Sequence, residues 1–516
     1  MSSTAKVAAV LLLSTTMTCG FNLPWGSVKP WAGSAVGARG DSCRREERVR
    51  LRGRFCHALA CRMGASDNGE VITSLAAIAD MERKKQQEEE LRNSDSIMWE
   101  CLKGTLQSKQ ELREEQRKHG ADVASCTYPA PEPLMKFMKK GKDRVADVIS
   151  SFAPVTQEQV IEAFSSGALL ADLSHWGGLV VTGEDRYKFV SGLCTNRVVG
   201  LKPGDVRPAC FLSKVGRTVD LTTLAVLSDS ILILCSPNRV LQLFQDLDAL
   251  IFPKDKVKCL DISDGLARFH ILGPKAEELI SRMKDLKLPG PFRSSPLVLD
   301  GRSMNGLVLQ GAGCSAAGYT LVASAGDGKV LWEELMRVAG PEVVCVGQTG
   351  WEVVRTVDGV PAAGAELTLD YNPLEAGLWS TVSFDKGCYI GQESMARLKT
   401  YDGVKQNLWA IHFPVDSSGV DNSVALLGAK LFAEREGQAR SVGSITSVLP
   451  EPLHTEDGQV FHCLGYVKGG LETKDTTIFA ELADDDGGSS ERRKGVVRNI
   501  PFATRTVQQS ADNLVS

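Results

Sequence analysis

Between about residues 150 and 404, apolar positions switch between short continuous runs and helical spacing. Residues 230–235 form a continuous apolar run of strand length, whereas residues 239–251 carry apolar side chains every three to four positions. The same patterns predict further strands at 257–262 and 319–323, and further helices at 275–283 and 329–338. Strands that alternate with helices over long spacers predict a layered α+β core over residues 151–404.

The pattern changes after residue 404, where helical spacing fades. Short apolar runs there are separated by Gly, Pro, Asp and Asn, and they fall at 408–413, 430–432, 442–448, 463–467 and 477–482. Evenly spaced short strands with turn residues between them predict a small antiparallel β-domain. We expect a C-terminal β-barrel over residues 405–512.

The segment before the core is polar. Residues 81–120 are rich in strong helix formers of mixed charge and have only a thin apolar stripe, which is typical of a solvated helix. Prolines within 126–133 then interrupt any helix, because proline lacks the amide donor. Residues 66–150 are therefore expected to form a polar helical segment and linker, and the folded body is expected to begin between Pro133 and residue 150.

The first 65 residues have the composition of a targeting segment. Lys6 precedes a short apolar run at 7–13, and an Arg-rich, acid-poor stretch follows Phe21. Residues 1–65 hold ten Lys and Arg against three Asp and Glu. A signal peptide followed by a basic transit-like segment favours a bipartite plastid presequence over plain secretion, and the apolar run is too short to span a bilayer. We expect delivery to the plastid stroma and no membrane span in the mature protein.

Composition limits the remaining possibilities. The 516 residues are 43% hydrophobic and carry a net charge of −4, which gives no general attraction to nucleic acid. The fourteen cysteines form no CxxC pair and no cluster with zinc-like spacing, so reduced thiols and no protein-only metal site are expected. No Walker loop, GxGxxG or HExxH pattern is present. His175 is expected to serve local packing or hydrogen bonding.

The segment around Cys388 has the most distinctive chemistry. Residues 382–384 are expected to end a strand, Lys386 and Gly387 to form a turn, and residues 391–398 to begin a helix. This arrangement would place Cys388 near a helix N-terminus and beside the Lys386 ammonium, and both favour the thiolate. A structural thiol buried in a turn explains the spacing equally well.

Residues 386–393, KGCYIGQE, are similar to the signature of the YgfZ branch of the folate-binding GcvT/YgfZ superfamily. The resemblance continues through 396–398 and 400–403 in a form like that of plastid members, and it covers roughly residues 160–410. Other motifs that match in order lie at 183–186, 189–196, 201–204, 216–220, 246–248, 261, 273–274, 351–361 and 372–377.

The resemblance implies a three-domain GcvT-like fold around a central hole that can hold tetrahydrofolate. It implies that Cys388 and Lys386 act in the chemistry, that Asp220 assists it, and that folate contacts come from the following residues: Asn196, Asp220, Glu352, Arg355 and Tyr389. YgfZ-type proteins are associated with the assembly or repair of iron–sulfur clusters, so iron–sulfur proteins or their assembly factors are the expected partners. Arg186 has either a place beside the hole or a structural ion pair.

Two positions depart from the aminomethyltransferase pattern. Val357 stands where the transferases have a glutamate that anchors the pterin, and valine cannot accept its N–H donors; Glu352 or Asp358 would replace it only if the strand register turns them inward. Asp220 stands alone where the transferases have paired aspartates, and it is equally an exposed strand-end residue.

Three functions follow from these residues. The first is a plastid folate-binding factor that supports iron–sulfur proteins through Cys388. The second is a folate-dependent aminomethyl or one-carbon transferase in which Asp220 assists. The third is a non-catalytic scaffold that retains the fold.

Overall fold

The structure is a computed structural model. It describes residues 106–129, 142–311, 313–415, 423–435, 438–456, 458–469, 471, 477–482 and 491–503. These all belong to one compact unit, Glu88–Ser516. The predicted presequence, and the part of the predicted polar helix before residue 106, lie outside the described residues.

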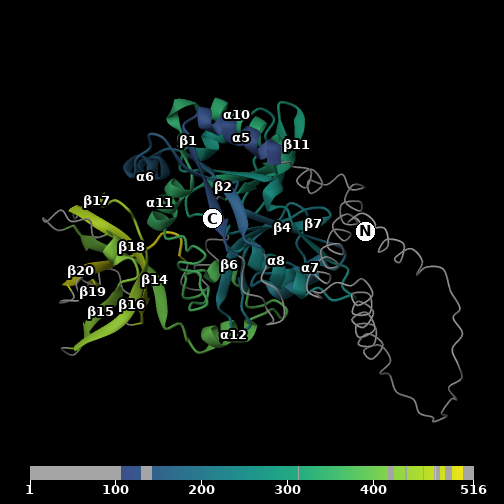
Figure 1. The fold of residues 1–516 in the computed structure, drawn as a ribbon. Helices are drawn as coiled ribbons and strands as arrows, with labels where there is room; N and C mark the ends of the chain where they lie inside the picture. The colour runs from purple at the N-terminus through teal and green to yellow at the C-terminus, as the bar shows by residue number, and fades with distance from the viewer. Residues whose placement is uncertain are drawn as a thin grey trace, which may run out of the picture. The chain divides into compact units, whose positions relative to one another are not determined.

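A six-stranded sheet forms the first layer of the core (Figure 1). Its strand order is β10-β11-β12-β9-β3-β13, and all neighbours are antiparallel except β13 and β3. The bounds are β3 Leu169–Asp172, β9 Leu266–Leu272, β10 Ser294–Leu299, β11 Arg302–Gln310, β12 Gly318–Ser324 and β13 Val344–Val346. Helices that accompany it are α6 Gln157–Ser166, α9 Ala276–Ile280, α10 Ala325–Ala339 and α11 Gln348–Asp358. Trp332 of α10 is fully buried and packs 5.6 Å from both Phe152 and Phe269, measured between ring centroids.

A five-stranded antiparallel sheet with the order β5-β6-β7-β4-β8 forms the second layer. Its strands are β4 Gly177–Thr182, β5 Val206–Leu212, β6 Thr218–Val226, β7 Ser230–Cys235 and β8 Lys258–Asp261, and its helices are α7 Arg186–Leu193 and α8 Val240–Ala249. The continuous apolar run predicted as a strand is β7, with every residue buried. The helical spacing predicted after it is α8, which buries Val240, Leu243 and Leu247. The predicted α+β core is confirmed.

The C-terminal strands close into a six-stranded antiparallel barrel, because β14 pairs with both β20 and β18 at the ends of the order β14-β20-β19-β15-β16-β18. The bounds are β14 Gln406–Pro414, β15 Lys430–Arg435, β16 Gln438–Val448, β18 Gly458–Lys468, β19 Thr477–Leu482 and β20 Glu491–Arg498, with β17 Leu453–Thr455 added beside β18 and the short helix α13 Ser423–Leu426. The predicted barrel is confirmed.

The polar segment before the core is part of the folded body, which corrects the expected boundary. Helix α5, Leu106–Lys118, packs on α10 (Figure 1). Strand β1, Ala121–Tyr128, pairs antiparallel with β2, Arg144–Phe152. Arg113 of α5 is buried and pairs with Asp172 of β3 at 3.0 Å. A helix with a thin apolar stripe is solvated only when its polar side chains have no buried partners. In α5, the polar side chain of Arg113 has such a partner in Asp172.

Candidate functional site

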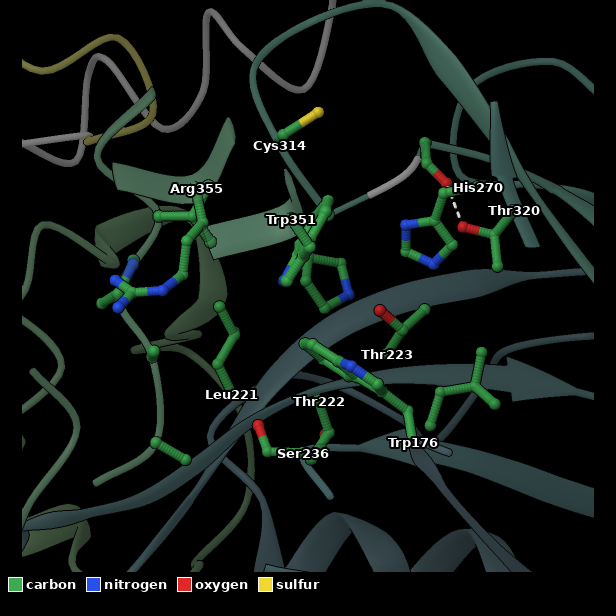
Figure 2. Close-up of a pocket in the computed structure, with 18 of the residues that line it drawn as sticks. Trp176, Leu221, Thr222, Thr223, Ser236, His270, Cys314, Thr320, Trp351 and Arg355 are labelled. Carbon is green, nitrogen blue, oxygen red and sulfur yellow. Dashed lines mark hydrogen bonds between the residues drawn. The ribbon is translucent and has the colours of Figure 1, made fainter. Parts of the chain in front are cut away.

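A cavity of about 810 Å³ lies among residues of both core sheets, the β1–β2 hairpin and α11 (Figure 2). Aromatic side chains line it, among them Tyr128, Trp176, Phe292 and Trp351. The polar side chains among its lining residues are Thr222, Thr223, Ser236, Arg268, His270, Gln310, Thr320, Gln348, Glu352 and Arg355, among others. A largely apolar wall with a few polar groups is typical of a small-molecule site, and the volume lies within the usual range of roughly 300–1,000 Å³.

Two tryptophans organise the cavity wall. Trp176 and Trp351 meet edge to face, with 5.9 Å between ring centroids and an interplanar angle of 85°. His270 meets Trp351 in the same way, at 5.5 Å and 85°. Figure 2 shows these rings together with Thr223 and Thr320. Rings fixed by edge-to-face packing form a rigid wall against which a flat ligand can stack.

Strand β9 contributes two basic residues to the cavity, Arg268 and His270. They lie two positions apart on the strand, so their side chains lie on the same face. The Nε of Arg268 donates to Nε2 of His270 at 2.9 Å, which leaves the proton of a neutral ring on Nδ1. The guanidinium lies over the ring of Trp176, 4.9 Å from its centroid. Burial lowers the pKa of Arg268 to about 10.

Glu352 and Arg355 also line the cavity, but they lie on a helix. Residues 352–358 belong to α11, so the expectation that a strand register decides their direction is wrong. Because the two residues are three apart on a helix, they share a face, and the Nε of Arg355 donates to Glu352. Glu352 also accepts from Gln348 at 2.7 Å.

Asp358 and Val357, the other two α11 residues considered for the pterin contact, do not line the cavity. Asp358 is buried and accepts from the backbone and hydroxyl of Ser315, whose amide lies at 2.7 Å. Val357 packs against an apolar cluster that includes Leu173 and Val353. Of the two carboxylates considered as replacements at the pterin position, Glu352 is therefore the one that faces the cavity.

Asp220 lies beneath the cavity wall and not at an exposed strand end. It is fully buried on β6 and accepts from the amide and hydroxyl of Ser236, at 2.9 and 2.7 Å, and from the amide of Leu221 at 3.0 Å. Burial raises the pKa of its carboxyl to about 6. Ser236 and Leu221 line the cavity. Asp220 therefore holds two cavity residues in place.

Cys388 lies on an exposed loop and is not among the residues that line the cavity. It is the exposed member of the nine cysteines within the described residues, all of which are free. The predicted strand before it is wrong, since residues 379–381 form a 3₁₀ turn and 382–384 have no strand partner. The helix after it, α12 Gln392–Thr400, is confirmed.

The ammonium of Lys386 is committed to backbone carbonyls, which differs from the expected role beside Cys388. It donates to the carbonyls of Ser191, Cys194 and Asn196 at 2.6, 2.7 and 2.8 Å, at the C-terminal end of α7. A lysine has three donors, so all of them are used. Partial burial lowers its pKa. The structure thus assigns Lys386 to fixing the loop on α7.

The remaining predicted folate contacts also lie away from the cavity lining. Tyr389 is buried next to Cys210 and Leu212, with the Lys386 ammonium 4.8 Å from its ring centroid. Asn196 donates to the carbonyl of Pro208 at 2.8 Å. The structure brings only Glu352 and Arg355 of the predicted set into the cavity wall. Arg186 donates to the carbonyls of Gly183 and Ser228 at 2.9 and 3.0 Å.

Sequence reasoning missed Trp176, Arg268 and Ser236. One signal was available: Arg268 and His270 alternate within the otherwise apolar strand LARFHIL, which marks a polar face inside a buried sheet. His175 is a hydrogen-bonding residue as expected, with Nε2 2.8 Å from Oε1 of Gln348, and burial lowers its pKa to about 3.

The described residues hold neither a metal-binding cluster nor a membrane-spanning helix. Within them, no group of three or more His, Cys, Asp or Glu side chains is placed to hold a metal ion. Their helices also include none with both the length and the apolar character needed to cross a membrane.

Comparison with known proteins gives a consistent family. The model of the GCVT N-terminal domain matches residues 135–386. A chloroplastic protein of Arabidopsis thaliana, whose name assigns it provisionally to the transferases, is 30% identical over 375 residues, which are 72% of this chain and 79% of that protein. The aminomethyltransferase of Caldanaerobacter subterraneus is 27% identical over 300 residues, 56% of this chain and 78% of the relative.

The fold has a solved counterpart in the glycine cleavage system aminomethyltransferase T from Bartonella henselae. The TM-score is 0.58 at 19% identity, over 77% of this chain and 98% of that structure. The two sheets and the terminal barrel thus define an aminomethyltransferase-like fold. With the family model and the Arabidopsis relative, the chain belongs to the GcvT family. Membership of the YgfZ branch stays a prediction.

Proposed function

We propose that this protein binds a reduced folate in the cavity walled by Trp176 and Trp351 and acts as a folate-dependent one-carbon transferase of the aminomethyltransferase type. The observation that carries the proposal is the cavity itself, which combines aromatic walls with a carboxylate and arginine pair on one helix face. The curated relatives named as aminomethyltransferases support the same class.

The cavity residues fit a pterin. A flat bicyclic ring can stack against the fixed faces of Trp176 or Trp351, and its N–H donors need a buried acceptor. Glu352 offers carboxylate oxygens at the cavity wall, which Val357 cannot do. The folate, when bound, supplies the nitrogen atoms that accept a one-carbon unit; the chain's own residues hold and orient it.

Asp220 acts as a positioning residue in this proposal. It has no exposed surface, and its oxygens fix Ser236 and Leu221, which line the cavity. A buried carboxylate close to the site also contributes a negative potential that favours positive charge developing on a transferred group. Its loss should therefore affect turnover more than folate affinity.

The binding test is a titration of the protein with 5-formyl-tetrahydrofolate, in which isothermal titration calorimetry and tryptophan fluorescence measure binding. Saturable binding is expected, and Glu352→Gln should weaken it by about tenfold or more through loss of a charged acceptor. Glu342→Gln, at an exposed site, is the matched control. Absence of saturation at near-millimolar ligand would overturn the folate assignment.

The transfer test follows formation of methylene-tetrahydrofolate from an aminomethyl donor and tetrahydrofolate. Asp220→Asn is expected to lower kcat while KM for folate stays within about threefold, because the residue lies behind the wall and not on it. A protein that binds folate but shows no turnover with any aminomethyl donor would retain the binding assignment and lose the transferase one.

A second function is favoured by Cys388, which is exposed on a loop that Lys386 ties to α7. In this alternative, the protein supports iron–sulfur proteins through that thiol, as the KGCYIGQE signature suggests. Cys388→Ser should then leave folding and folate binding unchanged but fail to restore cluster enzymes in cells lacking the protein. Full restoration by Cys388→Ser would exclude this role.

Plastid localisation belongs to the same proposal. The basic, Arg-rich stretch after Phe21 and the chloroplastic name of the Arabidopsis relative support it. Fusion of residues 1–65 to a fluorescent protein should direct it to the plastid. Secretion of the fusion would favour the plain signal-peptide interpretation.

A further inference from the structure

We infer that Arg268 binds a carboxylate of the ligand that occupies the cavity, so that the site takes an acidic molecule and not a neutral one. The inference deepens the proposed function, on which it rests for the identity of the cavity as a ligand site. It concerns a residue that neither the motifs nor the family comparison single out.

The first step is the lack of a counter-charge for Arg268. The cavity is lined by two arginines, and Arg355 is neutralised by Glu352 and by Glu366 at 3.3 Å. Arg268 forms no ion pair within the described residues, and its Nη1 is buried without a hydrogen-bond partner there. An unpaired buried charge is costly, and proteins keep such groups chiefly where a ligand supplies the partner.

The second step is the fixed direction of the guanidinium. Its Nε is held by Nε2 of His270 at 2.9 Å, and its face lies 4.9 Å from the ring centroid of Trp176. The backbone amide of Arg268 is held by the hydroxyl of Ser174 at 3.0 Å. With Nε and one face committed, the terminal nitrogens hold the donors that have no partner, and a pair of such donors matches the two oxygens of a carboxylate.

The third step is that, among the described residues, no other anion pairs with Arg268. Asp220 is a carboxylate that acts electrostatically on Arg268, and its oxygens are used by Ser236 and Leu221. Nε1 of Trp176, next to the guanidinium, is likewise buried without a hydrogen-bond partner among the described residues. A ligand carboxylate has enough lone pairs to satisfy both donors.

The carboxylate has two possible sources, the glutamyl tail of a folate and a separate small acid that serves as co-substrate. Four probes distinguish them: 5-formyl-tetrahydrofolate, 6-methyl-tetrahydropterin, which lacks the tail, and acetate with its neutral counterpart acetamide. Each is titrated against wild-type protein, Arg268→Gln and Arg268→Lys, with Arg302→Gln as the control on an exposed arginine of β11. Calorimetry and the fluorescence of Trp176 and Trp351 report binding.

A tail carboxylate predicts that Arg268→Gln weakens 5-formyl-tetrahydrofolate by roughly 10- to 100-fold and leaves 6-methyl-tetrahydropterin unchanged. A separate acid predicts that wild-type protein prefers acetate to acetamide and that Arg268→Gln removes this preference without changing folate affinity. Arg268→Lys should retain part of either effect, because it keeps the charge and loses the fork.

Equal affinities of wild-type protein and Arg268→Gln for all four probes would overturn the inference while folate binding itself still stands. If the wild-type protein does not bind folate but still prefers acetate to acetamide, the proposed function is overturned and the inference about Arg268 stands. If Arg268→Gln does not fold, phenylglyoxal modification of the wild-type protein replaces it. Protection of Arg268 by the bound acid, mapped by mass spectrometry, is expected, and modification unaffected by ligand would contradict the carboxylate contact.

Discussion

At the scale of single residues, Lys386 shows how a motif residue can serve structure and not chemistry. Its ammonium satisfies three carbonyls at the C-terminal end of α7, where the helix dipole also favours positive charge. Lys386→Met should lower the free energy of unfolding by about 2–3 kcal/mol, measured by urea denaturation. Lys188→Met, on the exposed face of α7, is the control and should be near neutral. Equal midpoints for the two variants would contradict this role.

Asp220 should give the protein a measurable pH dependence. Folding raises the pKa of its carboxyl from 3.8 to about 6, because burial disfavours the charged form. The folded state therefore holds this proton more tightly than the unfolded chain. The stability it contributes is fully present below about pH 4 and is lost as the pH rises to about 6.

Asp220→Asn cannot titrate, so it isolates that contribution. The unfolding free energy of wild-type protein relative to the variant should fall by roughly 3 kcal/mol in total from well below pH 4 to well above pH 6, and stay level beyond that range. Urea titrations at several pH values measure it, with Asp248→Asn, an exposed carboxyl, as the control. Parallel pH profiles for wild type and Asp220→Asn would show that burial does not perturb this group.

The sequence predicted part of the site and could not predict its geometry. Glu352 and Arg355 were identified, because the family motif places both there, and they line the cavity. Cys388 is expected from the motif to act in the chemistry, but the structure puts it on an exposed loop outside the cavity lining. Sequence spacing gives neighbours along the chain, whereas the cavity is assembled from strands and helices that are distant in sequence. For that reason Trp176 and Arg268 were not found.

At the scale of elements, helix α5 is held to the core by a buried ion pair. Arg113 lies 3.0 Å from Asp172, and Gln116 donates to the same carboxylate at 2.6 Å. Arg113→Met should cost about 3–5 kcal/mol, because it leaves Asp172 charged and buried without its cation. Thermal unfolding measures the loss, and Arg117→Met, exposed on the same helix, is the control.

A compensating change sharpens this test. Adding Asp172→Asn to Arg113→Met removes the stranded charge and should recover part of the lost stability. If α5 were the solvated helix that its sequence suggests, Arg113→Met would be as neutral as Arg117→Met. The apolar periodicity of this segment could not reveal the ion pair, because the partners lie about sixty positions apart in the chain.

The strands and helices of the core were more predictable than α5. The strand Ser230–Cys235 is predictable because a continuous apolar run indicates a strand buried on both faces. The helix α8 is predictable because apolar residues at helical spacing indicate a helix buried on one face. The segment at 352–358 is expected from the sequence as a strand, but it belongs to the helix α11. This helix contains Val353, Val354 and Val357. Several β-branched residues favour a strand locally, and packing of α11 against α6 and β2 overrides that preference.

At the scale of the whole folded unit, Glu366 links the cavity helix to the barrel. It is fully buried and accepts from Arg355 of α11, from the amide of Ala362, and from Thr446 and Ser447 of β16, the last two at 2.6 Å. One carboxylate therefore satisfies donors from three parts of the chain, including an arginine that lines the cavity.

Replacement of Glu366 should disturb stability and ligand binding together. Glu366→Gln presents an amide donor to groups that all donate, so two of its four partners lose their acceptor, and we expect a loss of about 2–4 kcal/mol in unfolding free energy. Arg355 would then keep Glu352 as its charged partner but lose Glu366, so folate affinity should also fall. Denaturation monitored by circular dichroism and a parallel folate titration test both effects, with Glu434→Gln on the exposed side of β15 as the control. A stable variant with unchanged folate affinity would show that the barrel and the cavity are energetically independent.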